Sequence, residues 1–520
     1  MFSALSARVL LIHPFLLLFL TILLLGGTSP SHAATSAAPP LDSAGIQAGM
    51  STLIAHLDSP AYAAAVTWEE HIVLAYQVAQ QRPPTPLEFV FLNLYRQQEP
   101  VSRSFALSVA LRGDALALTW EQCAAFLQRT DLSDWVATLP VRVQARALAQ
   151  VPSAYLLAAM QPQLAHVESA PAAMPAALAE PYTEYNVYYG YFHAHSELSD
   201  GEGDPLDDYI YARDQGGLDY FSLTDHGELL LIWPWQNKWQ ELKDAAQATY
   251  APGQFATLWG FEWSNPILGH VNVLNTDDYT NALSDFGIID LYDYLIARPE
   301  AFARFNHPGR YDLLFIEFLH LRLYAAAVPQ MVGIENYNKD DGFDEYYYGG
   351  SWFTDESYYD VGNRKGWYLG ALGGQDNHSV DYGTRNEFRT AALAQTLTRE
   401  AIIDAYRQRR FYATEDKDLE LDFRYQGYPM GSRLTGQPGG PRVFDVSACD
   451  GSGDTFQEAR LYRNGAQIAV QSVSGNCFQT TLTDPNPAGA NYYYIIVRQN
   501  DDNDANGRPD EALSSPIWIE

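Results

Sequence analysis

The sequence predicts a three-part protein whose largest part is a parallel α/β barrel. Between residues 183 and 423, short apolar β-type runs alternate with helical patterns, as parallel βα units require. Residues 34–167 instead place apolar side chains at three- and four-residue spacing, which predicts an all-α domain. Residues 424–520 carry short alternating runs with turn signals, which predict a small antiparallel β-sandwich. The Ala- and Pro-rich stretch 168–182 is a linker.

Residues 1–33 have the pattern of a signal peptide. Arg8 precedes the Leu-rich apolar run Val9–Leu25, and Ser31–Ala33 supplies small residues at a cleavage site. This pattern predicts an exported protein, periplasmic or extracellular. The run is nearly long enough to span a bilayer, so an uncleaved anchor is the alternative.

The charge balance excludes two classes of partner. The chain has 32 Lys and Arg residues against 63 Asp and Glu residues, a formal net charge of −31. Nucleic acids and anionic membranes bind basic surfaces, so we expect neither as a partner beyond the signal segment. A small-molecule substrate remains. The sequence gives no indication of oligomeric state.

The barrel region can be divided into elements in chain order. Asp204 and Pro205 have the residue types of an N-cap and first helical position. We expect further helices over Trp239–Thr249, Asp290–Arg298 and Thr398–Arg409, and strands over Val187–Phe192, Leu218–Leu223, Phe255–Glu262, Gly269–Leu274, Arg304–His307, Val332–Glu335 and Tyr368–Leu372. Asn464–Gly465 predicts a hairpin turn in the sandwich.

Histidines and acids gather where these strands end. His193 and His195 follow the first strand, and because residues two apart share one side of a strand, both imidazoles can reach one ion. Asp200 lies in the following Ser-Asp-Gly turn, and the next strand leads to Asp225 and His226. The carboxyl ends of barrel strands are where such folds keep their chemistry. Farther along, Glu262, His270, His307, Asp376 and His378 each follow an apolar run.

These clusters resemble the polymerase-and-histidinol-phosphatase (PHP) superfamily of metallohydrolases. The resemblance covers about Tyr188 to Met430, on the motifs HxH, SDG, TDH and GGQDNH. The segments GIENYN, NEFRTAALA and TREAIIDAYRQRRFYATED are most similar to the branch containing the CehA/McbA-type enzymes. The resemblance implies a distorted (β/α)7 barrel that holds up to three divalent ions.

The resemblance also implies which residues bind each ion. His193, His195, Glu262 and Asp376 would hold the first, Glu262, His270 and His307 the second, and Asp200, His226 and His378 the third. Mixed imidazole and carboxylate sites suit manganese, zinc or iron. Clustered cations lower the pKa of bound water and stabilise a developing oxyanion. The resemblance, with three cations to match phosphoryl charge, implies a phosphoesterase. A carboxyl-ester or carbamate hydrolase of CehA type and a non-catalytic binding module are the alternatives.

Four further residues are candidates for supporting roles. Glu335 is a candidate acceptor for a ligand or a proton, and Asp225 either orients His226 or a neighbour, or caps its strand. Arg310 and Arg385 are the nearest basic residues to the ligand segments. Each could clamp an anionic substrate, and a salt bridge to one of the many acids is the alternative.

Two features remain in the C-terminal part. Cys449 and Cys477 could pair in an oxidising compartment, but sequence cannot fix their separation, so a disulfide and two free thiols both stay open. The acidic loop Asp502–Asp510 has partial calcium-loop spacing, but Leu513 stands where a calcium loop has Glu. Calcium in this loop and an ordinary acidic turn are the two interpretations.

Overall fold

A computed structural model describes most of residues 53–112, residues 141–149 and most of residues 180–520. Positions outside the description are 54, 58, 99, 100 and 102, the short segments 232–236, 311–316, 350–355 and 504–506, and residues 286 and 438. The chain divides into two units, Met1–Leu41 and Asp42–Glu520. The first unit, with the predicted signal peptide, lies outside the described residues. No helix among the described residues is both long and apolar enough to cross a membrane.

The described part of the N-terminal region consists of helices and short connections. Its helices are α3 (Pro60–Ala63), α4 (Trp68–Gln80), α5 (Pro86–Gln98), α6 (Arg103–Arg112) and α9 (Val141–Ala149). Thr67 and Glu70 form a capping box at the start of α4, which satisfies backbone N–H groups that the first turn leaves without partners. The fully buried Ile72, Tyr76 and Phe91 lie in the apolar core of this region.

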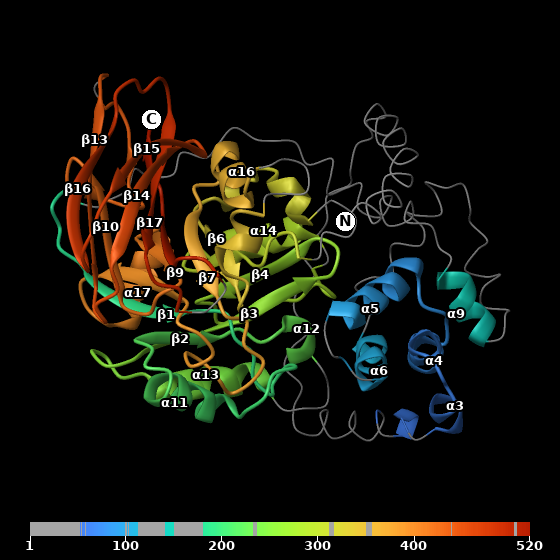
Figure 1. The fold of residues 1–520 in the computed structure, drawn as a ribbon. Helices are drawn as coiled ribbons and strands as arrows, with labels where there is room; N and C mark the ends of the chain where they lie inside the picture. Colours follow the sequence, from blue (N-terminus) through green and yellow to red (C-terminus); the bar gives the residue numbers. More distant parts are fainter. Residues whose placement is uncertain are drawn as a thin grey trace, which may run out of the picture. The chain divides into compact units, whose positions relative to one another are not determined.

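Three parallel strands begin the α/β part. They are β1 (Asn186–Tyr191), β2 (Tyr220–Leu223) and β3 (Ala256–Asn265), paired in that order. The connecting helices are α11 (Pro205–Asp214), α12 (Gly227–Leu230) and α13 (Lys238–Thr249), and α11 and α13 pack against β2 and β3 (Figure 1). The Asp204 side chain accepts a hydrogen bond from the Leu206 N–H and Pro205 is the first helical residue, as the sequence predicts.

The sheet continues through one reversed strand. Strand β4 (Gly269–Leu274) runs antiparallel to both β3 and β5 (Phe302–Phe305), and β6 (Met331–Asn338) and β7 (Gly370–Gly374) then follow parallel to β5. Only three residues separate β3 from β4, and a parallel pair needs a much longer crossover. The expectation of an all-parallel barrel is therefore corrected to a mixed sheet.

The remaining helical elements of this part follow the strands. They are α14 (Ile288–Ile296), the 3-10 turns η2 (Glu317–Leu321) and η3 (Ala325–Ala327), α15 (Gly342–Tyr346), α16 (Tyr358–Lys365) and α17 (Arg399–Arg407). The Thr398 side chain caps α17 by accepting from the Ala401 N–H. Among the described residues, no strand pairing joins β7 to β8 (Arg389–Ala394), so closure into a seven-stranded barrel stays a prediction.

The C-terminal part is joined to this sheet by hydrogen bonds. Strand β8 pairs antiparallel with β1 and with β9 (Phe411–Thr414), and β9 pairs with β18 (Glu511–Ser514). One sheet thus runs through β12 (Arg433–Leu434), β19 (Ile517–Ile519), β17 (Asn491–Gln499), β18, β9, β8 and the strands β1 to β7. Strand β14 (Phe456–Arg463) also pairs with β17, and β15 (Ala466–Ser472) pairs with β14.

A second sheet completes the predicted sandwich. Its strands are β11 (Tyr428–Pro429), β10 (Leu419–Tyr425), β13 (Arg442–Asp450) and β16 (Cys477–Asp484). Phe444 of β13, Leu461 of β14 and Ile495 of β17 share one apolar core, so the two layers pack face to face (Figure 1). Asn464 and Gly465 form the predicted two-residue turn between β14 and β15, both with positive φ.

Candidate metal centre

Nine side chains that lie in or shortly after the strands of the α/β part converge on one place. His193, His195 and Asp200 follow β1, His226 follows β2, Glu262 lies in β3, His270 in β4, His307 follows β5, and Asp376 and His378 follow β7. Eight of these side chains are at most 5 % exposed, and His378 is 25 % exposed. The structure therefore brings together all nine residues that the sequence predicts as ligands.

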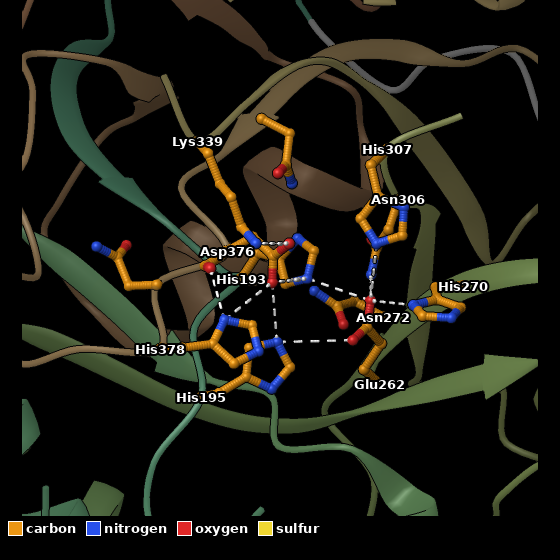
Figure 2. A network of polar contacts seen from close by, with 12 residues as sticks. His193, His195, Glu262, His270, Asn272, Asn306, His307, Lys339, Asp376 and His378 are labelled. Carbon is orange, nitrogen blue, oxygen red and sulfur yellow. Dashed lines mark hydrogen bonds and ion pairs between the residues drawn. The ribbon is translucent and has the colours of Figure 1, made fainter. Parts of the chain in front are cut away.

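Glu262 lies at the middle of this group (Figure 2). Its Oε1 atom is 3.2 Å from His193 Nε2, 3.4 Å from His270 Nδ1 and 3.5 Å from His307 Nε2. Its Oε2 atom is 3.6 Å from His195 Nε2 and 3.0 Å from His226 Nδ1. One carboxylate thus faces five imidazoles, an arrangement suited to a ligand that bridges two ions.

Asp376 and Asp200 occupy two further positions among the imidazoles. Asp376 Oδ1 lies 3.3 Å from His193 Nε2 and 3.1 Å from His195 Nε2 (Figure 2). Asp200 Oδ1 lies 3.5 Å from His226 Nε2, and Asp200 Oδ2 lies 3.4 Å from His378 Nε2. Each histidine of the centre therefore has a carboxylate oxygen within reach.

The ligand atoms fall into four overlapping groups whose members lie within 4.8 Å of one another. They are His195, Asp200, His226 and His378; His193, His307 and Asp376; His193, His195 and Glu262; and Glu262, His270 and His307. These groups could bind metal ions. They reproduce the second and third ligand sets implied by the sequence resemblance, with His195 added to the third.

Polar atoms without hydrogen-bond partners indicate that these residues fit metal ions. His193 Nε2, His195 Nδ1, Glu262 Oε2 and both carboxylate oxygens of Asp200 are buried and make no hydrogen bond within the protein. Such groups destabilise a fold by about 1–3 kcal/mol each unless something binds them. Imidazole nitrogens together with carboxylate oxygens form the donor set of zinc, manganese and iron sites.

The electrostatics keep the carboxylates charged. Burial alone would raise the pKa of Glu262 and of Asp376, but the surrounding imidazoles, His193 foremost, hold both pKa values well below their usual range. Burial and the neighbouring imidazoles of His378 and His226 lower the pKa of His195 to about 3, so its ring is neutral. Anionic carboxylates and a neutral imidazole are the forms that coordinate metal.

Glu335 orients His193. Its Oε1 atom is 2.7 Å from His193 Nδ1 and also accepts from Arg304 Nη2 at 2.6 Å. Its Oε2 atom accepts from the His307 backbone N–H at 2.6 Å. Burial would raise the Glu335 pKa, but His193 and then Arg304 lower it to about 2, so the anion fixes the imidazole that turns Nε2 toward Glu262. This contact matches the acceptor role predicted for Glu335.

Asp225 holds the turn that carries Asp200. Its carboxylate accepts from the Ser196 backbone N–H at 2.8 Å and from the Ser199 hydroxyl at 2.6 Å. Asp225 therefore orients the turn that follows His195, and not the His226 ring. The His226 Nδ1 atom lies 2.5 Å from the Ser264 hydroxyl oxygen.

The two predicted arginines differ in their surroundings. Arg310 Nη1 donates to Asp376 Oδ2 at 2.8 Å, so Arg310 belongs to the centre. Arg385 forms ion pairs with Asp340 and Asp381, the alternative role that the sequence leaves open. No described contact joins Arg385 to a predicted ligand.

Sequence reasoning missed Lys339 and Asn306. Lys339 Nζ lies 3.4 Å from Asp376 Oδ2 and its side chain is 38 % exposed (Figure 2). Asn306 Nδ2 donates to Glu262 Oε1 at 2.5 Å. Their positions in the sequence could have identified them, because Lys339 directly follows β6 and Asn306 directly follows β5, at the strand ends where the ligands also lie.

The backbone is strained at two of the ligands. His307 has φ of 25° and Asp376 has φ of 49°, a region that residues with a Cβ avoid. Such conformations persist where the surrounding structure enforces them, often at functional sites. Two residues before Asp376, a Cβ on Gly374 would lie 2.4 Å from Glu335 Oε1 and 2.8 Å from the His193 Cβ, so only glycine fits there.

Comparison with known families gives one partial match. A family model described as a protein of unknown function, DUF3604, matches residues 219–288. This segment includes Asp225, His226, Glu262 and His270.

The curated relatives are uncharacterized proteins of chlamydiae. One from Chlamydia muridarum is 30 % identical over 145 residues, 25 % of this chain and 22 % of the relative. One from Chlamydia pneumoniae is 23 % identical over 372 residues, 64 % of this chain and 57 % of the relative. The chain thus spans less than two thirds of the length of the relatives it matches.

A solved structure from Bacteroides vulgatus is also similar. It is described as a two-domain protein containing a predicted PHP-like metal-dependent phosphoesterase. The match covers 66 % of this chain and all of that chain, at 16 % identity and a TM-score of 0.37. At these values the likeness does not establish a shared activity.

Proposed function

We propose that this chain is an exported metal-dependent hydrolase that cleaves phosphate esters of small anionic molecules. The observation that carries the proposal is the position of Glu262 among five imidazoles, with Asp376 and Asp200 beside them. Divalent ions bound by such a set supply Lewis-acid activation of water and of the attacked ester. The motifs shared with the PHP superfamily, and with its CehA/McbA-type branch, agree with this assignment.

Two cations on one side of the centre favour an anionic substrate. Arg310 and Lys339 both approach Asp376 Oδ2, at 2.8 and 3.4 Å. His378 and Lys339 are 25 % and 38 % exposed, so we expect a substrate to approach the centre beside them. In a chain of net charge −31, this local positive charge suits a phosphoryl group, which a planar guanidinium and an ammonium can bind together.

The residues of the chain divide the work between them. Arg310 and Lys339 would bind and orient the substrate anion, and the buried Glu335 keeps His193 in place. Asp225 fixes the turn that presents Asp200. Glu335 and Asp225 are positioning residues, because both carboxylates are fully buried behind the ligands.

The proposal is tested by metal analysis and substrate screening of His193→Ala. We expect the wild-type protein to contain manganese, zinc or iron, and the variant to lose metal and at least about 100-fold in activity. The substrates are chromogenic phosphodiesters, phosphomonoesters and carboxyl esters, with inorganic phosphate as an expected inhibitor. His56→Ala, a histidine of the helical region, is the matched control and should behave as wild type.

Several outcomes would contradict the proposal. Unchanged metal content in His193→Ala would show that the centre is assigned wrongly, and turnover that survives a chelator would refute the mechanism. Cleavage of carboxyl esters alone would favour the CehA-type alternative. Metal binding without turnover of any of the three substrate classes would favour a binding module. Export is tested separately, by locating the chain after fractionation of cells that express it.

A further inference from the structure

A second acidic group lies outside the proposed catalytic centre. Asp416 and Asp418 stand in the short connection between β9 and β10, and Asp450 ends β13. Oxygen atoms of the three carboxylates lie within 4.8 Å of one another. Asp416 is fully buried and Asp450 is 4 % exposed. Three acidic side chains are thus held together, two of them buried and Asp418 partly exposed.

No basic side chain among the described residues forms an ion pair with this group. Among the described residues, no Lys, Arg or His nitrogen lies within 4.0 Å of any of the three carboxylates. The adjacent Lys417 turns to Glu387 instead. Like charges at this spacing repel by several kcal/mol in a buried setting, so the arrangement requires a counter-ion or a proton.

Gln499 gives an independent sign of a ligand. This side chain of β17 is fully buried, and its Nε2 atom donates to Asp416 Oδ2 at 2.8 Å and Asp450 Oδ2 at 2.9 Å. Its Oε1 atom is buried with no hydrogen-bond partner, as is Asp418 Oδ1. Because the two ends of a carboxamide have the same shape, turning the group over would point Oε1 at the carboxylates. The cluster would then present four oxygen ligands.

Other contacts fix the carboxylates so that oxygens remain for a ligand. Asp450 Oδ1 accepts from the Gly453 and Asp454 backbone N–H groups at 2.6 and 2.7 Å, which leaves Oδ2 toward Asp416. Asp416 Oδ1 accepts from the Asp418 N–H at 3.0 Å. Cys449, the neighbour of Asp450, forms a disulfide with Cys477, so β13 and β16 are also joined covalently at this point.

We propose that Asp416, Asp418, Asp450 and Gln499 form a calcium site that ties both sheets of the sandwich to the end of β9. The donors are oxygens only, which calcium prefers and which distinguishes this site from the histidine-rich centre. The site differs from the calcium loop considered from the sequence. In that loop, Asp502 Oδ2 accepts from the Gly507 N–H and Asp510 Oδ2 from the Asn503 N–H, while residues 504–506 lie outside the described part.

A shared proton is the competing explanation. Burial, followed by contact with Asp450, raises the pKa of Asp416 to about 8, so a proton between the two carboxyls would also relieve the repulsion. The two explanations make different predictions for the effect of calcium. A proton-bridged pair would leave the Tm unchanged when calcium is added, whereas a calcium site would raise the Tm of the protein with Asp416 but not that of Asp416→Asn.

The test uses the full chain in the His193→Ala background, which removes one ligand of the histidine centre, and the imidazoles that remain there are poor calcium ligands. Calorimetric titration with calcium chloride should give one site per chain. A hundredfold excess over Kd should raise Tm by about 2–3 °C. Asp416→Asn and the more exposed Asp418→Asn should each abolish the heat of binding and the rise in Tm. Asp445→Asn, an exposed acid on the same strand β13, is the matched control and should retain both.

The outcomes separate the alternatives. Calcium binding by Asp416→Asn and Asp418→Asn at wild-type affinity would overturn the proposal, as would the absence of binding at millimolar calcium in the His193→Ala protein. A Tm of the wild-type cluster that does not rise with calcium would favour the shared proton and overturn the calcium site. Unchanged circular dichroism of Asp418→Asn shows that loss of binding is not loss of fold. None of these results depends on whether the chain proves to be a hydrolase.

Discussion

The Glu335 carboxylate links the metal centre to buried residues around it. It contacts His193, the Arg304 guanidinium and the His307 backbone N–H, and all three partners are almost fully buried. A charge in this position stabilises the ring orientation of one ligand and the backbone of another. Partners of this kind are as important to metal affinity as the ligands are.

Glu335→Gln tests this role. The amide keeps the shape but loses the charge that holds His193 and Arg304, so we expect metal affinity to fall about 10–100-fold. The unpaired Arg304 charge should also lower the free energy of unfolding by about 3–5 kcal/mol. Metal titration of the chelated protein and urea unfolding measure the two effects. Glu345→Gln, at an exposed position on α15, should change neither, and an unaltered affinity in Glu335→Gln would contradict the assignment.

Lys339 provides a second test at the scale of one side chain. Lys339→Met removes the ammonium near Asp376 but keeps most of the aliphatic stem, so we expect KM for an anionic phosphoester to rise about tenfold or more. The kcat value and metal content should stay near those of wild type. A neutral carboxyl ester is the matched control substrate, and an equal effect on both substrates would argue against anion binding by Lys339.

The short helix α12 depends on a buried acid. Glu228 Oε1 accepts from the Ala282 N–H at 2.5 Å and the Ser264 N–H at 3.2 Å, which ties α12 to β3 and to the segment after β4. Burial raises the Glu228 pKa from 4.5 to about 7, and the two N–H donors only partly oppose it. Between about pH 4.5 and 7, Glu228 is therefore protonated in the folded chain and ionised in the unfolded chain.

This shift predicts a pH dependence of stability. Because the folded pKa lies above the unfolded value, the contribution of Glu228 is fully present below about pH 4.5 and is lost as pH rises through 7. The lost contribution is on the order of 3 kcal/mol. Glu228→Gln should therefore gain stability relative to wild type between pH 5 and 7.5. Thermal unfolding of both proteins at these pH values measures this, and parallel curves would contradict it.

The elements show what sequence patterns can and cannot specify. Asp204 and Pro205 predicted the start of α11, and the two-residue spacing of His193 and His195 predicted that both face the centre, because these signals are local. The direction of β4 could have been predicted, because only residues 263–268 separate the two strands expected there and a parallel crossover needs a dozen or more residues. By contrast, no local signal separates Arg310 from Arg385, because their partners come from distant segments.

At the scale of the molecule, one hydrogen-bonded sheet runs from β7 through β1 and β9 into the sandwich. The boundary predicted near residue 423 falls inside β10, Leu419–Tyr425, which pairs with β13 in the second sheet. Strands β9 and β18 pair directly, so the two parts share backbone hydrogen bonds. We therefore expect them to unfold together and to depend on the same stabilising links.

The disulfide between Cys449 and Cys477 is one such link. It joins residues 28 apart in sequence, and closing a loop of this length removes entropy from the unfolded chain worth about 3–4 kcal/mol. The double variant Cys449→Ser and Cys477→Ser should lose about that much free energy of unfolding while keeping its metal. Urea unfolding measures the loss, and added reductant should change the wild type but not the double variant. Equal stability of the two proteins would contradict the prediction.

Strand β9 has no partner on one side until β18 has been synthesised. A ribosome releases β8 and β9 long before it makes β18, so the growing chain would present unsatisfied amides to strands of other molecules. A polypeptide kept unfolded by chaperones until its whole length has passed through a translocon would avoid that exposure. The late arrival of this strand thus gives the proposed route out of the cytoplasm a physical advantage.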